Sequence, residues 1–187
     1  MAILISSMQN FFKKLALSFT KESGLAGFFF FLVLCSWYIL RPVRNEMAVQ
    51  NSDILPYLLG VGAFVMLLLN PIYSWLASRR NLKGVLVGCY SFFILNLLVF
   101  ISLWKFFNLS SAIWLSQIFY VWCNVYSFFV VSIFWVVIIN LFRGEGASNA
   151  FGVIAAGGSL GAFLGSEISK QLASTFNESG IIFFTLI

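Results

Sequence analysis

Two arginines stand three positions apart in the stretch CSWYILRPVRNEMA, directly after a long apolar run. On a helix that turns by about 100° per residue, Arg41 and Arg44 share a face with Trp37, and Tyr38 and Asn45 lie at its margin. A guanidinium group binds phosphate or carboxylate through two parallel, charge-assisted hydrogen bonds. We therefore predict that Arg41, Arg44, Asn45 and Tyr38 bind an anion in a water-filled cavity between helices. The alternative is that both arginines snorkel to the lipid headgroups.

A single amide supplies the next candidate. Asn124 lies in the uncharged stretch 110–142, and we expect it to be the most buried polar side chain of the chain. An amide inside a membrane either hydrogen-bonds a neighbouring helix or lines a substrate path. Both interpretations stay open at this point, and Asn124 joins the predicted substrate-binding residues.

The composition identifies the environment in which these residues lie. The chain is 61% hydrophobic and 9% charged, whereas soluble globular proteins carry about 25% charged residues. The sequence therefore predicts an all-α integral membrane protein. Because histidine is absent and the six acidic residues are scattered, the usual zinc sites and histidine-based catalysis are excluded. We expect no enzymatic activity, no metal, no cofactor and no nucleic-acid partner.

The apolar segments must position these side chains. A spanning helix needs about 20 mostly apolar residues, and five segments meet this requirement. We expect Pro71 to break the second segment near its end, and Pro42 to disfavour a helical conformation at Arg41. An eight-residue apolar stretch at 180–187 predicts the start of a sixth span. Residues 1–23 are predicted to form an interfacial segment, followed by a transmembrane bundle over 24–187. The predicted spans are 25–47, 54–77, 85–104, 110–142 and 147–172.

The basic residues predict the orientation, because lysine and arginine in short loops favour the cytoplasmic side. A cytoplasmic N-terminus would place on that side Lys13, Lys14, Lys21, Arg79, Arg80, Lys83 and Arg143. The other side would hold only Arg41, Arg44, Lys105 and Lys170. We therefore expect a multi-pass protein of the cell membrane, in a bacterium the inner membrane, with the N-terminus in the cytoplasm.

Small residues recur in the last complete span. Gly157, Gly161 and Gly165 are four positions apart, and Gly152 accompanies them. Small residues at this spacing let helices approach closely in lipid. We predict that these four glycines pack against a neighbouring helix, and a further hypothesis is that this contact slides during transport.

Three stretches carry a resemblance to a known family. WYILRPVRNEMA, FYVWCNVYSFFVVSIFW and FRGEGASNAFGVIAAGGSLGAFLG resemble the corresponding parts of ATP/ADP antiporters of bacteria and plastids, and of bacterial major facilitator proteins related to them. The resemblance covers most of residues 25–175. It implies the N-terminal six-helix bundle of a major facilitator-type transporter, with a truncated sixth helix.

The resemblance also implies a function. It implies a secondary transporter that moves a small, anionic organic solute by alternating access, with nucleotide-related compounds among the candidates. Arg44 stands where the antiporters carry a lysine that helps to bind phosphates, and Asn124 stands where the nucleotide carriers have a glutamate. The implied partners are the lipid bilayer, the solute, and a missing C-terminal half or partner chain.

Two other functions stay open on the residues alone. The chain could be a non-transporting membrane scaffold or assembly protein that keeps the fold without the transport cycle. It could also be a truncated fragment without a function of its own. Loss of the charges of Arg41 and Arg44 would distinguish a transporter from a scaffold.

Overall fold

The computed structural model describes residues 21–78, 81–106, 113–142 and 147–175. These residues form α2 (Lys21–Gln50), a short 3-10 helix η1 (Ser52–Ile54), α3 (Leu55–Ala77), α4 (Leu82–Phe106), α5 (Ile113–Leu141) and α6 (Ala147–Thr175). Five of the helices are long and apolar enough to cross a membrane. The chain is therefore an all-helical, multi-pass membrane protein over the part described. The predicted start of a sixth span at 180–187, and nearly all of the predicted N-terminal segment 1–23, lie outside the described residues.

Local chemistry explains where the helices begin and continue. Asn81 caps α4, because its side-chain oxygen accepts a hydrogen bond of 3.0 Å from the backbone N–H of Gly84, which is a typical N-cap contact. The helix therefore starts earlier than the apolar pattern from residue 85 indicates. The predicted break at Pro71 is wrong, and Pro42 also lies inside a continuous helix. Proline has a helix-compatible φ and removes only one backbone hydrogen bond, so a membrane helix tolerates it.

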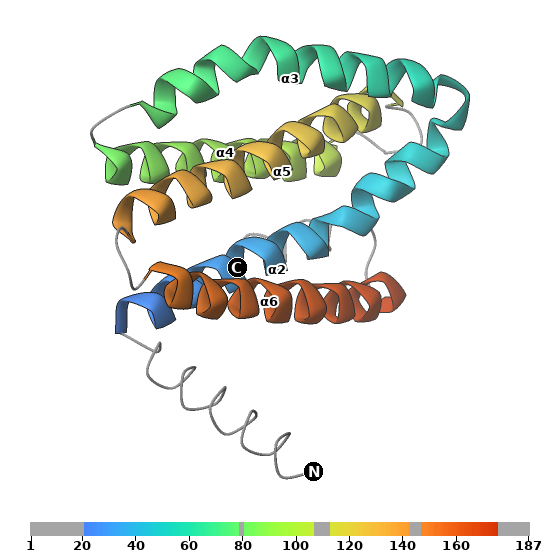
Figure 1. Ribbon diagram of the computed structural model, residues 1–187. Coiled ribbons are helices and arrows are strands. Elements are labelled where there is room, and N and C mark those ends of the chain that lie inside the picture. Colours follow the sequence, from blue (N-terminus) through green and yellow to red (C-terminus); the bar gives the residue numbers. More distant parts are fainter. Residues whose placement is uncertain (1–20, 79–80, 107–112, 143–146, 176–187) are drawn as a thin grey trace.

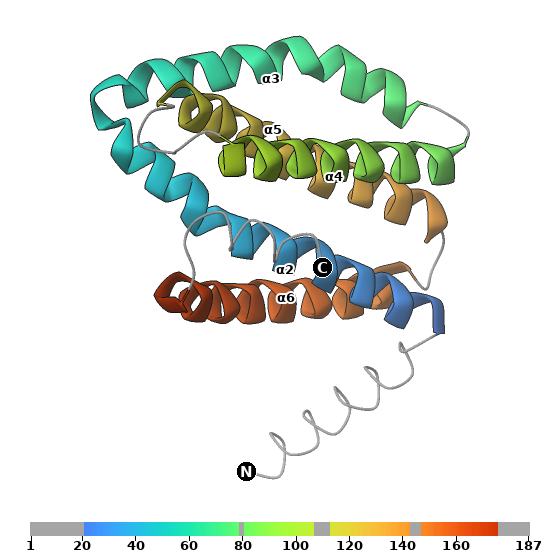
Figure 2. The same ribbon diagram turned by 180° about the vertical axis from the view of Figure 1, so that it is seen from behind.

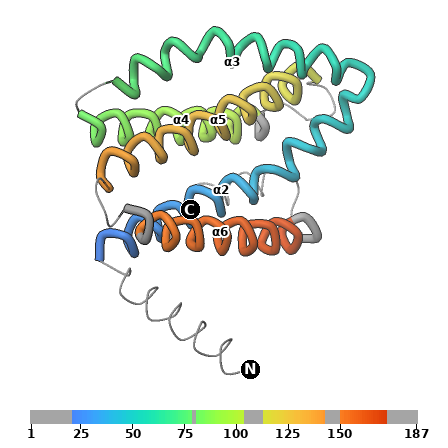
Figure 3. The backbone as a smooth tube through the Cα atoms, in the orientation of Figure 1, coloured from blue at the N-terminus to red at the C-terminus, as the bar shows by residue number. Residues whose placement is uncertain are grey.

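The helices pack around α5. Figures 1 and 2 show α2 and α6 side by side on one side of the bundle and α3 on the opposite side, while α5 contacts α2, α3 and α4. The trace in Figure 3 shows that α2 and α6 run in the same direction and that α5 runs opposite to α2. The long contact between α2 and α6 and the contact of α2 with α5 place α2 between two neighbours. These neighbours position the two arginines.

A row of close backbone contacts joins α2 to α6. A Cβ atom on Gly157 would collide with the carbonyl of Gly27, and one on Gly161 would collide with the carbonyl of Phe31. A Cβ on Gly165 would lie 2.6 Å from the carbonyl oxygen of Cys35. Only glycine fits at these positions. We call the three glycines of α6 and their partners on α2 the glycine seam.

The fourth predicted packing glycine does not belong to the seam. Gly152 is exposed, and a Cβ atom there would meet nothing within 4 Å among the described residues. Gly158 is in close contact instead, since a Cβ on it would collide with the ring of Phe30. Gly152 fails as a packing residue because it points away from α2 in the described structure, although it shares the small size of the others.

Buried apolar side chains form two clusters along α2. One lies around Ile39, Leu40, Val43 and Met47, with Phe119 and Cys123 of α5 among its members. The other lies around Ala26, Phe30 and Val33, with Phe134 and Ile138 of α5. Burial of such side chains against their neighbours holds α2 on α5 by close packing, the main attraction available between helices in lipid. Trp122 and Tyr126 of α5 pack against both clusters.

Candidate functional site

Arg44 lies between α2 and α5, and two amides hold its guanidinium group. One Nη atom donates a hydrogen bond of 3.2 Å to the side-chain oxygen of Asn124. The other donates one of 2.9 Å to the side-chain oxygen of Asn45. The group also lies over two aromatic rings, 5.5 Å from the ring centre of Trp37 and 6.0 Å from that of Tyr120. The structure thus brings together three predicted site residues and adds two aromatic ones.

The electrostatic state of this group follows from its partners. Amide oxygens and aromatic faces attract a cation without neutralising it. Within the described part of the chain, Arg44 forms no ion pair with a carboxylate, and its Nε atom is buried without a hydrogen-bond partner. Arg44 therefore keeps a full positive charge in a half-buried position, with donor capacity to spare.

The position of the Arg44–Asn124 contact along the helices tests the alternative that Arg44 snorkels to the lipid headgroups. At 1.5 Å per residue, Gln50 at the end of α2 lies about 9 Å beyond Arg44, and Asn124 lies about 16 Å along α5 from its first residue, Ile113. A snorkelling arginine extends toward the near end of its helix and the headgroups. The guanidinium of Arg44 instead contacts a residue well inside the 29-residue helix α5. This contact favours a role within the bundle.

The structure places Arg41 and Tyr38 apart from this contact. Arg41 is exposed, and its guanidinium lies 5.5 Å from the ring centre of Tyr38. The side chain of Tyr38 borders the glycine seam, because its Cβ lies 3.0 Å from a Cβ built on Gly165. Arg41 and Tyr38 therefore lie on the side of α2 toward α6, while Arg44 faces α5. The helical wheel, which places the arginines on one face, does not distinguish these two neighbours.

A second polar contact lies about two turns before Arg44 on α2. The hydroxyls of Ser36 and Tyr126 are 3.0 Å apart, and Ser36 also donates to the carbonyl of Val33 at 2.9 Å. The ring of Tyr126 lies 6.1 Å from that of Trp37 and stacks on Trp122 at 5.3 Å. Trp122 and Tyr126 pack against both apolar clusters and so connect them. The sequence pattern could have indicated Ser36 and Tyr126, since both lie near predicted site residues on their helices.

A third polar cluster joins the end of α2 to the start of α5. Asn51 is buried, and its side-chain nitrogen donates to the carbonyl of Met47 and to the hydroxyl of Ser116, both at 2.9 Å. Its side-chain oxygen accepts a hydrogen bond of 3.1 Å from Gln117. All the hydrogen-bonding atoms of the Asn51 amide group thus have protein partners. Sequence reasoning missed this cluster, because an asparagine at a helix end is ordinary in any loop.

No family model matches the sequence, and neither a curated protein nor a solved structure matches it detectably. Among the described residues, no three side chains of histidine, cysteine, aspartate or glutamate gather where they could hold a metal ion. The chemistry of the site is therefore that of a cation held by amides and aromatic rings. It can attract an anion, orient it through charge-assisted hydrogen bonds, and stack an aromatic or planar group.

Proposed function

We propose that this chain is part of a secondary transporter that moves a small anionic organic solute across a membrane by alternating access. The observation that carries the proposal is the guanidinium of Arg44, held between α2 and α5 by the amides of Asn45 and Asn124. A charge inside a bundle of membrane helices is costly and usually serves a function. Here, an anionic solute would supply the counter-charge.

The surroundings of Arg44 support a site for an organic anion. Trp37 and Tyr120 provide apolar, stacking surfaces beside the charge. The exposed Arg41 lies within one turn of the same helix and adds a second positive charge. The guanidinium of Arg41 lies over Tyr38 and not at the Arg44 contact, so Arg44 is the group that would bind the anionic part of the solute, such as a phosphate or a carboxylate. The absence of a carboxylate at position 124 favours this wider class over nucleotide exchange in particular.

The proposal extends to the rest of the transporter. In this proposal the five described helices belong to a six-helix bundle that pairs with a second bundle, supplied by a longer chain or by a partner. The solute would bind at the interface of the two bundles. The parallel pair α2–α6 and the contact of α2 with α5 would then form two sides of the path.

Anion binding is the first test. The chain is purified in lipid nanodiscs, and its thermal unfolding is measured with inorganic phosphate, a nucleoside diphosphate and a dicarboxylate in turn. An anion that binds the folded state raises the unfolding temperature. We expect Arg44→Gln to abolish that increase and Arg44→Lys to keep part of it, because a lysine supplies the charge without the planar fork.

Lys170→Gln is the matched control. Lys170 is exposed on α6, next to Ser169, which contacts Ile39 one turn before the arginines. The substitution removes one positive charge at a similar level of the bundle and away from Arg44. If Arg44→Gln and Lys170→Gln lower the anion effect equally, general charge attraction explains it and the site is rejected. A scaffold without transport would show no anion effect in any variant.

A further inference from the structure

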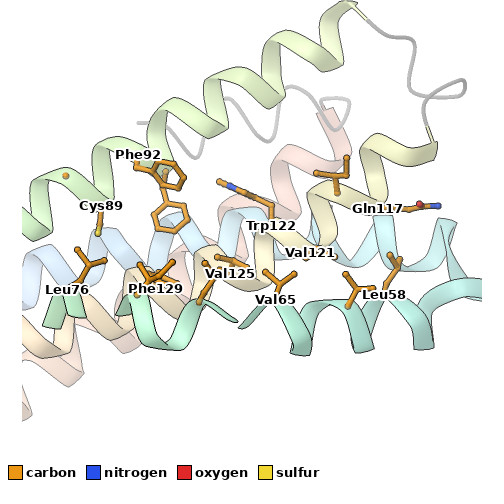
Figure 4. Close-up of a pocket in the computed structure, with 16 residues that line it drawn as sticks. Leu58, Val65, Leu76, Cys89, Phe92, Gln117, Val121, Trp122, Val125 and Phe129 are labelled. Carbon is orange, nitrogen blue, oxygen red and sulfur yellow. The ribbon is translucent and has the colours of Figure 1, made fainter. Parts of the chain in front are cut away.

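A long apolar groove lies between α3, α4 and α5, and Arg44 is not among its lining residues. It has a volume of about 670 Å³, and Figure 4 shows side chains that line it. One face of α3 lines it, from Leu58 through Val65 to Leu76, and Trp122 and Phe129 of α5 form its floor. At 1.5 Å per residue, the stretch of α3 from Leu58 to Leu76 spans about 27 Å. This length is close to the hydrocarbon thickness of a bilayer, about 30 Å.

The groove opens toward lipid. α3 and α4 make little contact with each other, and both expose apolar side chains beside the groove, among them Leu68 on α3 and Leu95 on α4. These two helices are also the least buried of the five candidate spans. In a membrane, the molecules that reach an apolar opening between such helices are the acyl chains of lipids.

One end of the groove is polar. A second pocket, of about 690 Å³, shares Leu76, Gly88 and Cys89 with the groove. Its other lining residues include Trp75, Ser78 and Asn81 at the turn from α3 to α4. Tryptophan is enriched where the membrane meets water. The exposed Lys83 lies in the first turn of α4, so this end also carries positive charge.

We propose that the groove binds an anionic glycerophospholipid. One acyl chain lies along α3 over the floor formed by α5, and the headgroup lies at the polar pocket near Lys83. An apolar groove that meets a polar pocket at one end, with Lys83 in the adjacent turn of α4, matches the apolar and polar parts of such a lipid. Because an acyl chain extends through one leaflet, about half of the bilayer thickness, it occupies the half of the groove next to that pocket. The site is separate from Arg44, and it does not depend on the proposed transport.

Two glycines give a matched pair of variants. Gly88 lines both pockets, and a Cβ atom on it would meet nothing within 4 Å, so Gly88→Leu would fill the groove without a collision. Gly60 on α3 is equally unobstructed and lines neither pocket, so Gly60→Leu adds the same side chain outside the groove. Any effect specific to Gly88→Leu reports on the groove.

The test uses Trp122 as a sensor. In a variant whose only tryptophan is Trp122, with the other five replaced by phenylalanine, fluorescence is measured in nanodiscs with brominated phosphatidylglycerol or brominated phosphatidylcholine. Bromine atoms in an acyl chain quench an indole in contact with them. We expect stronger quenching by phosphatidylglycerol, loss of half or more of it in Gly88→Leu, and no change in Gly60→Leu. Lys83→Gln should lower the preference for the anionic lipid about fivefold, the contribution of one basic side chain near an anionic surface.

Native mass spectrometry of the unaltered chain gives an independent measurement, which also serves if the single-tryptophan variant does not fold. The chain and its Gly60→Leu variant should retain a phosphatidylglycerol molecule that the Gly88→Leu variant loses. Equal retention in all three would overturn the proposal. So would an absence of quenching at Trp122, which would mean that a protein segment, such as a helix of a second copy, covers the groove.

Discussion

The hydroxyl of Ser169 donates a hydrogen bond of 3.2 Å to the backbone carbonyl of Ile39, 130 positions earlier in the chain. The glycine seam repeats the same offset, because Gly157, Gly161 and Gly165 face residues 27, 31 and 35. The two helices are thus parallel and in register over four successive contacts, one per turn. Such a regular contact positions Tyr38 and Arg41 beside α6 and leaves Arg44 to α5.

The glycine seam predicts that a methyl group added to one of its glycines lowers the stability of the protein. Gly161→Ala would drive a methyl group into the backbone carbonyl of Phe31, which cannot move without shifting α2. Overpacking of this kind costs about 1–3 kcal/mol. We expect a lower unfolding temperature in detergent, measured by scanning fluorimetry. Gly152→Ala is the control, since its Cβ would meet nothing within 4 Å, and we expect a change within about 0.5 kcal/mol.

The contact of Arg44 with Asn124 predicts the effect of a carboxylate at that position. Asn124→Asp would place a negative charge within about 3.2 Å of the guanidinium and neutralise it. We expect the variant to unfold at a higher temperature and to lose at least tenfold in affinity for the anion that Arg44 binds. Titration with that anion, followed by thermal unfolding, measures both. Tighter anion binding in Asn124→Asp would contradict the proposed role of Arg44.

The helical architecture can be predicted from the sequence, whereas most side-chain partners cannot. The length of each apolar run indicates all five long helices, because a spanning helix must satisfy its backbone inside lipid. The spacing of Gly157, Gly161 and Gly165 also indicates a close contact. The spacing does not identify α2 as the partner, nor does it exclude Gly152, because the direction of a glycine depends on the neighbour that the fold supplies.

The candidate site, too, can be predicted from the sequence only in part. Charge and the scarcity of polar residues single out Arg44 and Asn124 within apolar segments, and the structure brings these two together. Residue type alone does not single out Ser36 and Tyr126, because serine and tyrosine are common in membrane helices, and only their closeness to predicted site residues could indicate them. The groove beside α3 cannot be predicted from the sequence, because an apolar face that packs on a helix and one that packs on lipid have the same composition.

The hydroxyl pair between Ser36 and Tyr126 predicts a small coupling energy. Removing either hydroxyl, in Ser36→Ala or Tyr126→Phe, ends the 3.0 Å contact. Hydrogen bonds between membrane helices contribute about 0.6 kcal/mol on average. We therefore expect the double variant to lose about 0.6 kcal/mol less stability than the sum of the two single losses. Unfolding of the four proteins in a double-mutant cycle measures the coupling, and fully additive losses would show that the hydroxyls do not interact.

The buried cluster around Asn51 predicts a larger loss of stability when its hydrogen bonds are removed. Asn51→Leu would leave the amide of Gln117 without its partner at the junction of α2 and α5. It would also remove one hydrogen bond of the Ser116 hydroxyl, which keeps its bond to the carbonyl of Ile113. Leaving buried polar groups unsatisfied costs about 1–3 kcal/mol.

We expect this loss in the thermal unfolding of Asn51→Leu, and much less of it in Asn96→Leu. The side chain of Asn96 hydrogen-bonds only the carbonyl of Phe92, four residues earlier in its own helix, among the described residues. The two variants exchange the same side chains, so the difference between them isolates the contact between helices. Equal stability of both variants would mean that this cluster does not hold the end of α2 on α5. The position along α5 at which Arg44 contacts Asn124 would then depend on the apolar packing around Leu40 and Phe119 alone.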